Sequence, residues 1–266
     1  MKQTIFITGA SSGFGRETAK LFIQKGWNVV ATMRSPEKEM ELTALPGVSV
    51  VRMDVTDKAS IEAAIAGAGR IDVLLNNAGY GTLGALEFAP EEVIRQQMEV
   101  NFFGVIAVTR AVLPAMRAQR SGVIINVSSM GGRLVFPFST LYHASKFAIE
   151  GLTESLQYEL NPLGIRTKLI EPGGYKTDFV GRSLTTFGDG GIPEYKEGCD
   201  RLAALMGHEA LNENIGEVAE AIYQAATDGT ETLRYPVGAD AVQLLEARLK
   251  LDDIAFKKMM VAQLAM

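Results

Sequence analysis

A tyrosine and a lysine in the middle of the chain, Tyr142 and Lys146, have residue types and a spacing suited to proton transfer. Residues four apart lie one turn apart on the same face of a helix, so the ammonium of Lys146 can lie near the phenol of Tyr142. A neighbouring positive charge favours the phenolate, so we expect the pKa of Tyr142 to fall from its usual value of about 10. Such a phenol can exchange a proton with a substrate oxygen near neutral pH. The pair alone is weak evidence, because a tyrosine packed beside a lysine is common in unrelated helices.

Three glycines near the N-terminus, Gly9, Gly13 and Gly15, stand between an apolar strand pattern and a helical pattern. Glycine permits a tight turn and close approach of the backbone to a ligand, and the N-terminus of the following helix attracts an anion. This order of elements predicts a loop that binds the phosphates of a dinucleotide; an ordinary strand-to-helix connection is the alternative. The other candidate cofactor-binding residues of the loop are Ser11, Ser12 and Phe14.

The second predicted strand ends at Thr32, where the ribose of a bound adenosine is expected to lie. No Asp or Glu occurs between Glu17 and Glu37, and Arg34 closely follows the strand. An NAD-binding protein usually presents a carboxylate at this place, whereas a permanently charged guanidinium suits a 2′-phosphate. With the hydroxyl of Ser11 as a second donor, the pattern predicts NADP(H) in preference to NAD, unless Arg34 is only a solvated surface residue.

With these segments in view, the chain resembles the compact, single-domain branch of the short-chain dehydrogenase/reductase family from about Lys2 to about Asp240. The matching motifs follow the family's order: Thr8-Gly9-x-x-x-Gly13-x-Gly15, Asp54-Val55, Asn76-Asn77-Ala78-Gly79, Asn101, Ser129, Tyr142 with Lys146, and Pro172-Gly173-x-x-x-Thr177. Ser129 stands 13 residues before Tyr142, which is the family's usual interval and favours it over Ser128. Hydroxysteroid and retinol dehydrogenases are the most similar in character, through the segments 31–34 and 235–238.

The resemblance implies reversible hydride transfer between a nicotinamide and a carbonyl carbon. Tyr142 would exchange the proton, and Ser129 would hydrogen-bond the substrate oxygen. Lys146 would lower the tyrosine's pKa and bind the nicotinamide ribose, while Asn101 would hold a water that links Lys146 to solvent. The resemblance also implies cofactor contacts from Asp54, Val55, Asn77, Ala78, Gly79, Tyr142, Lys146, Pro172, Gly173 and Thr177.

Several of these polar residues also have purely structural interpretations. Asn76 and Asn77 are suited to closing a turn, and Asn101 is suited to capping a helix. His143 faces a different side of its helix from the tyrosine beside it, so we expect it to have a packing or surface role. The single cysteine, Cys199, has no nearby His or Asp partner, so we do not interpret it as a nucleophile.

The composition is that of a soluble α/β enzyme. A chain of 266 residues with 47% hydrophobic content can bury a large core, and its single cysteine fits a reducing compartment. A net charge of −5 without a basic cluster argues against nucleic-acid binding. No secretory leader is visible, and the longest apolar run near the middle, 102–108, is too short to span a membrane. We therefore expect a cytoplasmic protein and assign no metal site.

Alternating strand and helix patterns predict one α/β domain over 1–266, a Rossmann-type, doubly wound parallel sheet of about seven strands with helices on both faces. We expect strands near 3–8, 27–32, 48–53, 72–76, 122–128, 165–171 and 232–237. The main predicted helices are 13–25, 90–120 (two, joined or kinked), 141–160 and 216–226. Asn76, Ser129 and Pro172 all follow strands, so we expect them at the carboxyl edge of the sheet.

The segment from about 178 to about 212 has the composition of a mobile lid. Its spaced apolar residues are Phe179, Leu184, Phe187, Ile192, Tyr195, Leu202 and Met206, and the expected opposite wall is Leu134, Val135, Phe136 and Phe138. Unless these side chains only pack the lid onto the core, they predict a bulky apolar ketone or secondary alcohol as substrate. Arg133 and Arg182 leave open an anionic substrate, such as a 3-oxoacyl thioester on a carrier.

The last segment, about 240–266, continues beyond the usual end of compact family members. Its apolar spacing predicts an amphipathic helix that packs on its own subunit, covers a neighbour or forms a dimer contact. We expect a homo-oligomer, either a dimer or a tetramer. A non-catalytic NADP-sensing module is an alternative function, although the chain keeps the tyrosine and lysine. A sugar-nucleotide epimerase or dehydratase is disfavoured by the glycine spacing and the chain length.

Overall fold

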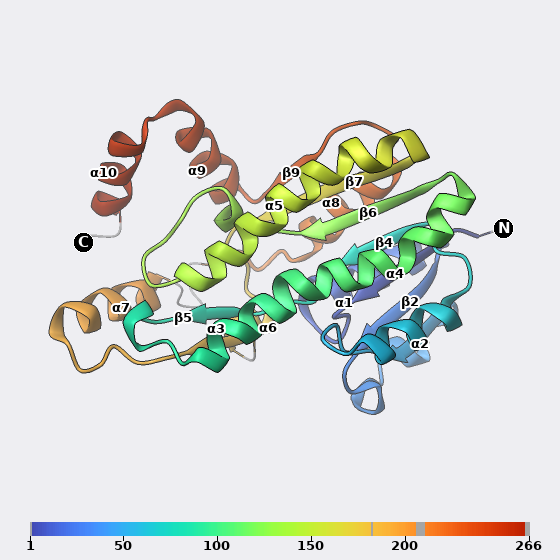
Figure 1. The fold of residues 1–266 in the computed structure, drawn as a ribbon, viewed down its shortest axis with the longest axis horizontal. Helices are drawn as coiled ribbons and strands as arrows, with labels where there is room; N and C mark the ends of the chain where they lie inside the picture. Colours follow the sequence, from blue (N-terminus) through green and yellow to red (C-terminus); the bar gives the residue numbers. More distant parts are fainter. Residues whose placement is uncertain (1, 182, 206–210, 264–266) are drawn as a thin grey trace.

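A parallel β-sheet forms the centre of the molecule (Figure 1). The computed structural model describes residues 2–181, 183–205 and 211–263, and within them seven strands pair in the order β3-β2-β1-β4-β6-β7-β9. These strands are β1 (Thr4–Thr8), β2 (Asn28–Met33), β3 (Val48–Arg52), β4 (Val73–Asn76), β6 (Gly122–Val127), β7 (Ile165–Pro172) and β9 (Arg234–Val237). Each of the seven predicted strands is present, with its ends moved by no more than two residues. The predicted fold class is therefore confirmed.

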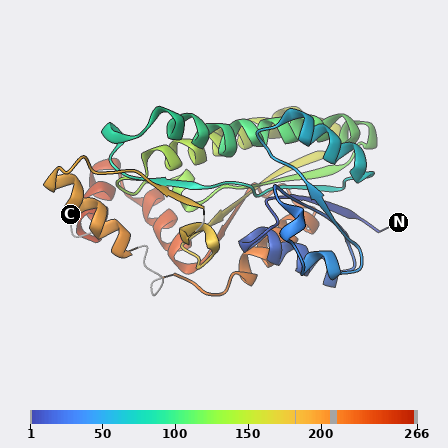
Figure 2. The same cartoon turned by 90° about the horizontal axis from the view of Figure 1, so that it is seen from below.

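Helices cover both faces of this sheet, as Figure 2 shows from below. Helices α1 and α8 pack on one face through side chains such as Phe22 and Ile222, while α2, α4 and α5 pack on the other through side chains such as Val112 and Leu160. The helices are α1 (Gly13–Gln24), α2 (Lys58–Ala68), α3 (Glu91–Met98), α4 (Gly104–Gln119), α5 (Thr140–Leu160), α6 (Asp178–Gly181), α7 (Pro193–Leu205), α8 (Gly216–Thr227), α9 (Ala239–Lys250) and α10 (Asp253–Gln263). Because both faces are covered, β1 is buried along its whole length.

The helical segment predicted over 90–120 consists of two helices, α3 and α4, which are joined by continuous helical backbone. Between α3 and α4, the five residues Glu99–Phe103 form a π-helical turn. A π turn widens the backbone by one residue per turn and is frequent at functional sites. Asn101, one of the candidate site residues, lies in this turn and is buried.

The carboxyl ends of the strands point toward the end of the molecule where α6, α7, α9 and α10 gather (Figure 1). A second sheet lies at this end, with β5 (Gly81–Leu83) paired in parallel to β8 (Leu184–Thr186). This pairing joins the segment that follows β4 to the predicted lid. The sequence does not predict the two short strands, because each has only three residues and no partner nearby in the chain.

The C-terminal extension packs on its own subunit. Leu245 of α9 and Phe256 and Met260 of α10 form a buried cluster with Leu134, and Met130 packs against it. The predicted amphipathic helix is therefore two helices, and their apolar face covers the segment that follows β6. Leu134, predicted to line a substrate wall, instead lies inside this cluster and is 2% exposed.

Candidate active site

The glycine-rich loop after β1 is locked to the turn after β4. The side chain of Asn77 donates from Nδ2 to the backbone oxygens of Thr8 and Gly9, both at 3.0 Å, and Thr8 Oγ1 accepts from the backbone nitrogens of Asn77 and Ala78. Gly9 has a φ of +69°, and a Cβ at Gly9 would lie 2.8 Å from Ala78 Cα. Asn77 thus closes a turn and also holds the candidate cofactor loop in shape.

Gly13 brings the glycine-rich loop close to the segment that follows β7. Gly13 has a φ of +53°, and its missing Cβ would be in ordinary contact with Thr177 at 3.5 Å. The loop and the segment after β7 therefore face each other across a short distance, with the N-terminus of α1 beginning at Gly13 between them. The first turn of α1 carries no acidic side chain, which leaves its backbone amides and dipole favourable to a phosphate.

The segment after β7 is fixed by α9. The backbone nitrogen of Gly174 donates to Asp240 Oδ2 at 2.7 Å, and Gly173 leaves no room for a Cβ against the same carboxylate. This contact joins Pro172 and Gly173 to the start of the C-terminal extension. The role of Asp240 could not be predicted from the sequence, because its hydrogen-bond partner, Gly174, lies 66 residues earlier in the chain.

Arg34 follows β2, where the adenosine is expected, and its side chain is exposed. A second arginine, Arg16, lies nearby but is already bound: its guanidinium donates to the backbone oxygen of Ser11 at 2.5 Å and to buried Glu39 at 2.6 Å. Arg16 therefore shapes the loop, and Arg34 is the arginine exposed to a ligand at this position. Sequence reasoning did not identify the Arg16–Glu39 pair, whose members are 23 residues apart.

The pair Asp54-Val55 follows β3 at the same edge of the sheet. Asp54 Oδ1 accepts from the backbone nitrogen and hydroxyl of Thr56, at 2.9 and 2.8 Å, so its carboxylate is held in a tight turn. Val55 packs closely against Gly104 at the start of α4. Both residues thus have structural contacts at the position where the family resemblance expects an adenine.

Ser129 and Tyr142 meet beyond the end of β6. Their side chains are hydrogen-bonded, and Ser129 Oγ also accepts from the backbone nitrogen of Gly131 at 3.0 Å. Lys146, one turn after Tyr142 on α5, donates from Nζ to the backbone oxygen of Val127 at 2.8 Å and lies 5.7 Å from the centre of the tyrosine ring. The structure therefore brings the three predicted side chains together.

The expected fall in the pKa of Tyr142 is wrong for the protein as it stands. Burial of the phenol raises the pKa of Tyr142 above its usual value, and the hydrogen bond from Ser129 offsets only part of that effect. The ammonium of Lys146 is directed at a backbone carbonyl instead of the phenol oxygen, and burial lowers the pKa of Lys146 to about 8. The spacing of the two residues predicted that they are neighbours, but it could not predict that both side chains are buried, and burial determines the direction of both pKa shifts.

Asn101 lies inside the π turn and is not a helix cap. Its side-chain oxygen accepts from the backbone nitrogen of Tyr80 at 3.0 Å, and its Nδ2 donates to Tyr80 O at 2.9 Å and to Ser145 Oγ at 3.1 Å. A Cβ at Gly79 would approach Asn101 Oδ1 to 3.2 Å. Asn101 thus joins the turn after β4 to the tyrosine helix. Ser145 and Tyr80 were not identified from the sequence, since only the fold reveals them.

Two alternatives that the sequence left open are decided by hydrogen bonds. Ser128 is 3% exposed, and its hydroxyl has no hydrogen-bond partner among the described residues, so Ser129 is the serine that faces the tyrosine. His143 is bonded at both nitrogens, Nδ1 to Gly131 O at 2.8 Å and Nε2 from Phe136 N at 2.9 Å. Burial lowers the pKa of His143, so it is a neutral packing residue, as predicted.

Aromatic side chains of the predicted lid reach the tyrosine. The ring of Phe179 lies edge-on to Tyr142 with centroids 5.7 Å apart, and Phe138 lies 6.3 Å from Tyr195 of α7. Gly81 is needed beneath Phe179, because a Cβ there would meet the ring at 2.7 Å. Of the predicted lining residues, Val135 is largely exposed. Met206, like Arg182, lies outside the described residues.

Arg133, the other candidate anchor for an anionic substrate, points inward. Its Nη1 lies 3.4 Å from Oε2 of Glu171, a fully buried carboxylate near the end of β7. The charge of Arg133 is therefore balanced within the protein.

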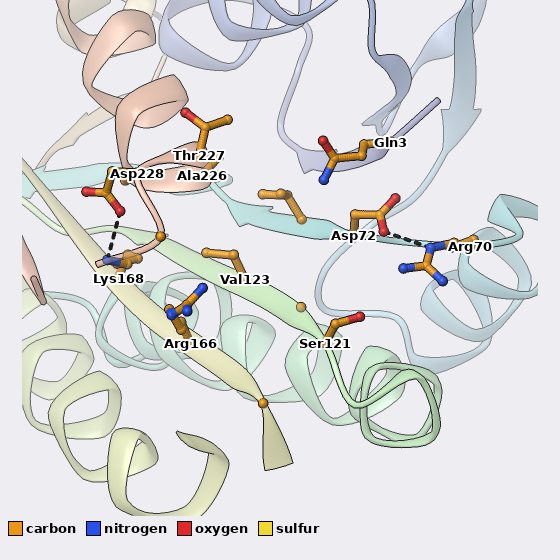
Figure 3. A pocket seen from close by; sticks show the side chains of 15 residues that line it. Gln3, Arg70, Asp72, Ser121, Val123, Arg166, Lys168, Ala226, Thr227 and Asp228 are labelled. Carbon is orange, nitrogen blue, oxygen red and sulfur yellow. Dashed lines mark hydrogen bonds and ion pairs between the residues drawn. The ribbon is translucent and has the colours of Figure 1, made fainter. Parts of the chain in front are cut away.

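A hollow of about 350 Å³ opens at the amino ends of the strands, opposite the tyrosine (Figure 3). Its charged side chains are already paired: Arg70 with Asp72 at 2.7 Å, Lys168 with Asp228 at 3.4 Å, and Arg166 with Glu231 outside the lining at 3.5 Å. Lys168 is also bonded to two backbone oxygens and to the hydroxyl of Tyr235. None of the predicted site residues lines this hollow, and its ion pairs have a structural role.

Two further searches cover the described residues. No group of three or more His, Cys, Asp or Glu side chains among them is arranged to hold a metal ion. One helical stretch, Glu91–Gln119, is long and apolar enough by length and composition to cross a membrane, a test that buried core helices also pass. Val108, Val112 and Met116 of this stretch are buried in the core beneath the sheet.

Comparisons with known proteins show the family to which the chain belongs. The short chain dehydrogenase family matches residues 3–186, so the chain belongs to that family of oxidoreductases. The uncharacterized oxidoreductase YusZ of Bacillus subtilis is 41% identical over 253 residues, covering 89% of each chain. A 3-ketodihydrosphingosine reductase of Bacteroides thetaiotaomicron is 45% identical over 178 residues, 67% of this chain and 66% of that protein. Human retinol dehydrogenase 8 is 38% identical over 192 residues, 68% of this chain and 62% of that protein.

Solved structures show the same fold. A short-chain dehydrogenase from Streptomyces avermitilis superimposes with a TM-score of 0.86 at 32% identity, covering 100% of this chain and 98% of that one. A short-chain dehydrogenase from Burkholderia cenocepacia in complex with NADP has a TM-score of 0.77 at 26% identity, covering 100% of this chain and 98% of that one. A nicotinamide cofactor is therefore supported for the family to which this chain belongs.

Proposed function

We propose that this protein is an NADP(H)-dependent carbonyl reductase or alcohol dehydrogenase that acts on a bulky apolar ketone or secondary alcohol. The observation that carries the proposal is the meeting of Ser129, Tyr142 and Lys146 at the carboxyl edge of the sheet, the edge from which the glycine-rich loop after β1 also leaves. When bound, the nicotinamide supplies or accepts the hydride.

The chain's own residues manage the proton and the substrate oxygen. Tyr142 is the proton donor in reduction and the acceptor in oxidation, and Ser129 stabilises the oxygen as charge develops on it. A phenol with a raised pKa is fully protonated near neutral pH, so it begins a reduction as the acid. Lys146 holds positive charge near the ring, and Asn101 braces the tyrosine helix through Ser145.

The preference for NADP is supported by Arg34. It is exposed after β2 with no carboxylate immediately beside it in sequence, and Arg16 is held by Glu39. The residues proposed to contact the cofactor are Gly9, Ser11, Ser12, Gly13, Phe14, Gly15, Arg34, Asp54, Val55, Asn77, Ala78, Gly79, Tyr142, Lys146, Pro172, Gly173 and Thr177.

The substrate class is supported by the rings that surround the tyrosine. Phe179 touches Tyr142, and Phe138 and Tyr195 extend the same apolar surface. Two relatives carry names that refer to long apolar molecules, a ketodihydrosphingosine and a retinol. We further propose that the protein is cytoplasmic and forms a homo-oligomer. The assembly is supported by two exposed aromatic side chains, Phe103 just before α4 and Phe147 on α5, which are 50% and 46% exposed.

The test is consumption of NADPH and NADH by the purified protein with long-chain and polycyclic ketones, together with Arg34→Ala. We expect NADPH to be preferred. Because a hydrogen bond to a charged group contributes about 1.5–3 kcal/mol, the variant should bind NADPH roughly tenfold or more weakly while its affinity for NADH is unchanged. Equal use of both cofactors by the unaltered protein would contradict the assigned preference. No turnover of any apolar ketone would contradict the substrate class.

A further inference from the structure

Two buried carboxylates meet behind the candidate active site. Glu150 lies on α5 and is 6% exposed; Glu171 lies on β7 and is fully buried. Both reach the same nitrogen of Arg234, whose Nε lies 2.9 Å from Glu150 Oε2 and 3.3 Å from Glu171 Oε1. Two ionised carboxylates that contact the same nitrogen and are both buried repel each other, and this repulsion acts on Glu171.

One oxygen on each carboxylate lacks a hydrogen bond. Glu150 Oε1 and Glu171 Oε1 are both buried and have no hydrogen-bond partner among the described residues, although Glu171 Oε1 keeps its ion-pair contact with Arg234. A buried, ionised carboxylate with an unsatisfied oxygen is costly, whereas a protonated one can donate a hydrogen bond to its neighbour. The two oxygens without hydrogen bonds and the common contact with Arg234 therefore favour a proton on the pair over two negative charges.

The charged groups that face the pair come from every element packed around it. Arg133 follows β6 and lies 3.4 Å from Glu171, and Glu154 of α5 lies 2.6 Å from Nη2 of Arg234. Lys146 precedes Glu150 by one turn of α5, and the charge of Glu150 acts on it. Three carboxyl groups thus lie among three cations, Arg133, Arg234 and Lys146.

Glu171 and Lys146 both have pKa values near neutral pH. Burial, followed by repulsion from Glu150, raises the pKa of Glu171 to about 7. Burial lowers the pKa of Lys146 to about 8, and the negative charge of Glu150 opposes that fall. Loss of the proton from the carboxylate pair and loss of the proton from Lys146 therefore fall in overlapping pH ranges.

We propose that Glu150 and Glu171 form a buried, proton-sharing pair that acts as a positioning element for Lys146. When the pair gives up its proton, the added negative charge holds the proton on Lys146, which extends the alkaline range in which the lysine is charged. The existence of the pair is independent of the enzyme's activity. Its effect on catalysis rests on the function proposed above.

The first test measures stability and needs no substrate. An acid whose pKa is raised by folding favours the folded state while it is protonated, and this advantage is lost as pH rises toward the folded pKa. Glu171→Gln keeps the shape of the protonated acid but cannot ionise. Its melting temperature relative to the unaltered protein should therefore be about equal at about pH 5 and higher by roughly 5 °C at about pH 8.

Glu154→Gln is the matched control, because Glu154 bonds the same arginine but its side chain is 52% exposed. Its difference in melting temperature should not change over this pH range. If Glu171→Gln gives a pH-independent difference like that of the control, the shared proton is overturned. If Glu171→Gln does not fold, Glu150→Gln removes the repulsion on Glu171, so its melting temperature relative to the unaltered protein should rise from about pH 5 to about pH 8, and a pH-independent difference would overturn the pair.

The second test follows ketone reduction across pH. In Glu150→Gln nothing opposes the burial of Lys146, so the alkaline fall in kcat/KM should begin roughly half a unit or more lower in pH, while Glu154→Gln keeps the unaltered profile. An unshifted alkaline fall in Glu150→Gln would overturn the influence on Lys146. Absence of turnover in the unaltered protein counts against the proposed function. In that case the melting temperatures still test whether Glu150 and Glu171 share a proton.

Discussion

Ser129 and Ser128 are neighbours in the chain, yet the structure gives them opposite surroundings. The hydroxyl of Ser129 is hydrogen-bonded to Tyr142, whereas that of Ser128 faces inward, close to Gly132. Extended backbone at the end of β6 accounts for the contrast, because successive side chains point to opposite sides. The two serines therefore provide a matched pair for testing the site.

Ser129→Ala should lower kcat/KM for ketone reduction by about 100-fold to 1,000-fold, the usual cost of losing one donor to a developing oxyanion. NADPH affinity, measured by fluorescence, should be nearly unchanged, because the hydroxyl is assigned to the substrate. Ser128→Ala should leave kcat/KM within about threefold, since its hydroxyl has no bonded partner among the described residues. A larger loss in Ser128→Ala than in Ser129→Ala would reverse the assignment.

At the scale of elements, the site depends on the contact between two loops. The loop after β1 and the turn after β4 meet at Gly9 and Ala78, and Asn77 bonds them together. The carboxyl ends of adjacent parallel strands bring the loops to one edge, and glycine allows them to touch. Cofactor binding and local stability should therefore fail together when this contact is broken.

Gly9→Ala should abolish measurable NADPH binding and lower the free energy of unfolding, because its Cβ would lie 2.8 Å from Ala78 at a φ of +69°. Gly26→Ala is the control: it has a φ of +84° and nothing within 4 Å of the added Cβ. The control should lose only about 1 kcal/mol of stability, as expected from backbone strain, and keep its NADPH affinity. Equal effects of the two changes on binding would count against the loop contact.

The sequence was sufficient for the elements whose patterns are local. Alternating apolar strands and helices predicted all seven strands of the main sheet, and ordered motifs predicted which residues gather at its edge. The sequence could not predict contacts between segments that are far apart in the chain. Examples are the pairing of Gly81 with Leu184, and the bond from Gly174 to Asp240. The direction of the pKa shift of Tyr142 was also out of reach, because burial determines it.

At the scale of the whole molecule, the C-terminal extension braces the active-site end. Phe256 of α10 is 6% exposed and packs in the cluster that covers the segment after β6. That segment lies between Ser129 and Tyr142. The extension thus supports the catalytic side of the molecule from within the same subunit.

Phe256→Ala should lower the free energy of unfolding by about 3 kcal/mol, the usual cost of removing a buried aromatic ring, in chemical denaturation. Leu249→Ala, at a site that is 73% exposed, should cost less than about 0.5 kcal/mol. The cost of Phe256→Ala should not depend on protein concentration, because the contact lies within one chain. A strong concentration dependence would place the extension on a neighbouring subunit instead.

The central claim is that the site transfers a hydride to a ketone while Tyr142 delivers the proton. The most direct measurement uses NADPH with deuterium at both positions of the nicotinamide C4, an apolar ketone, and mass spectrometry of the alcohol product. We predict deuterium on the carbinol carbon, and a rate at least about 100-fold lower in Tyr142→Phe with NADPH affinity retained. Product without deuterium, or a Tyr142→Phe rate within about tenfold of the unaltered protein, would contradict this claim.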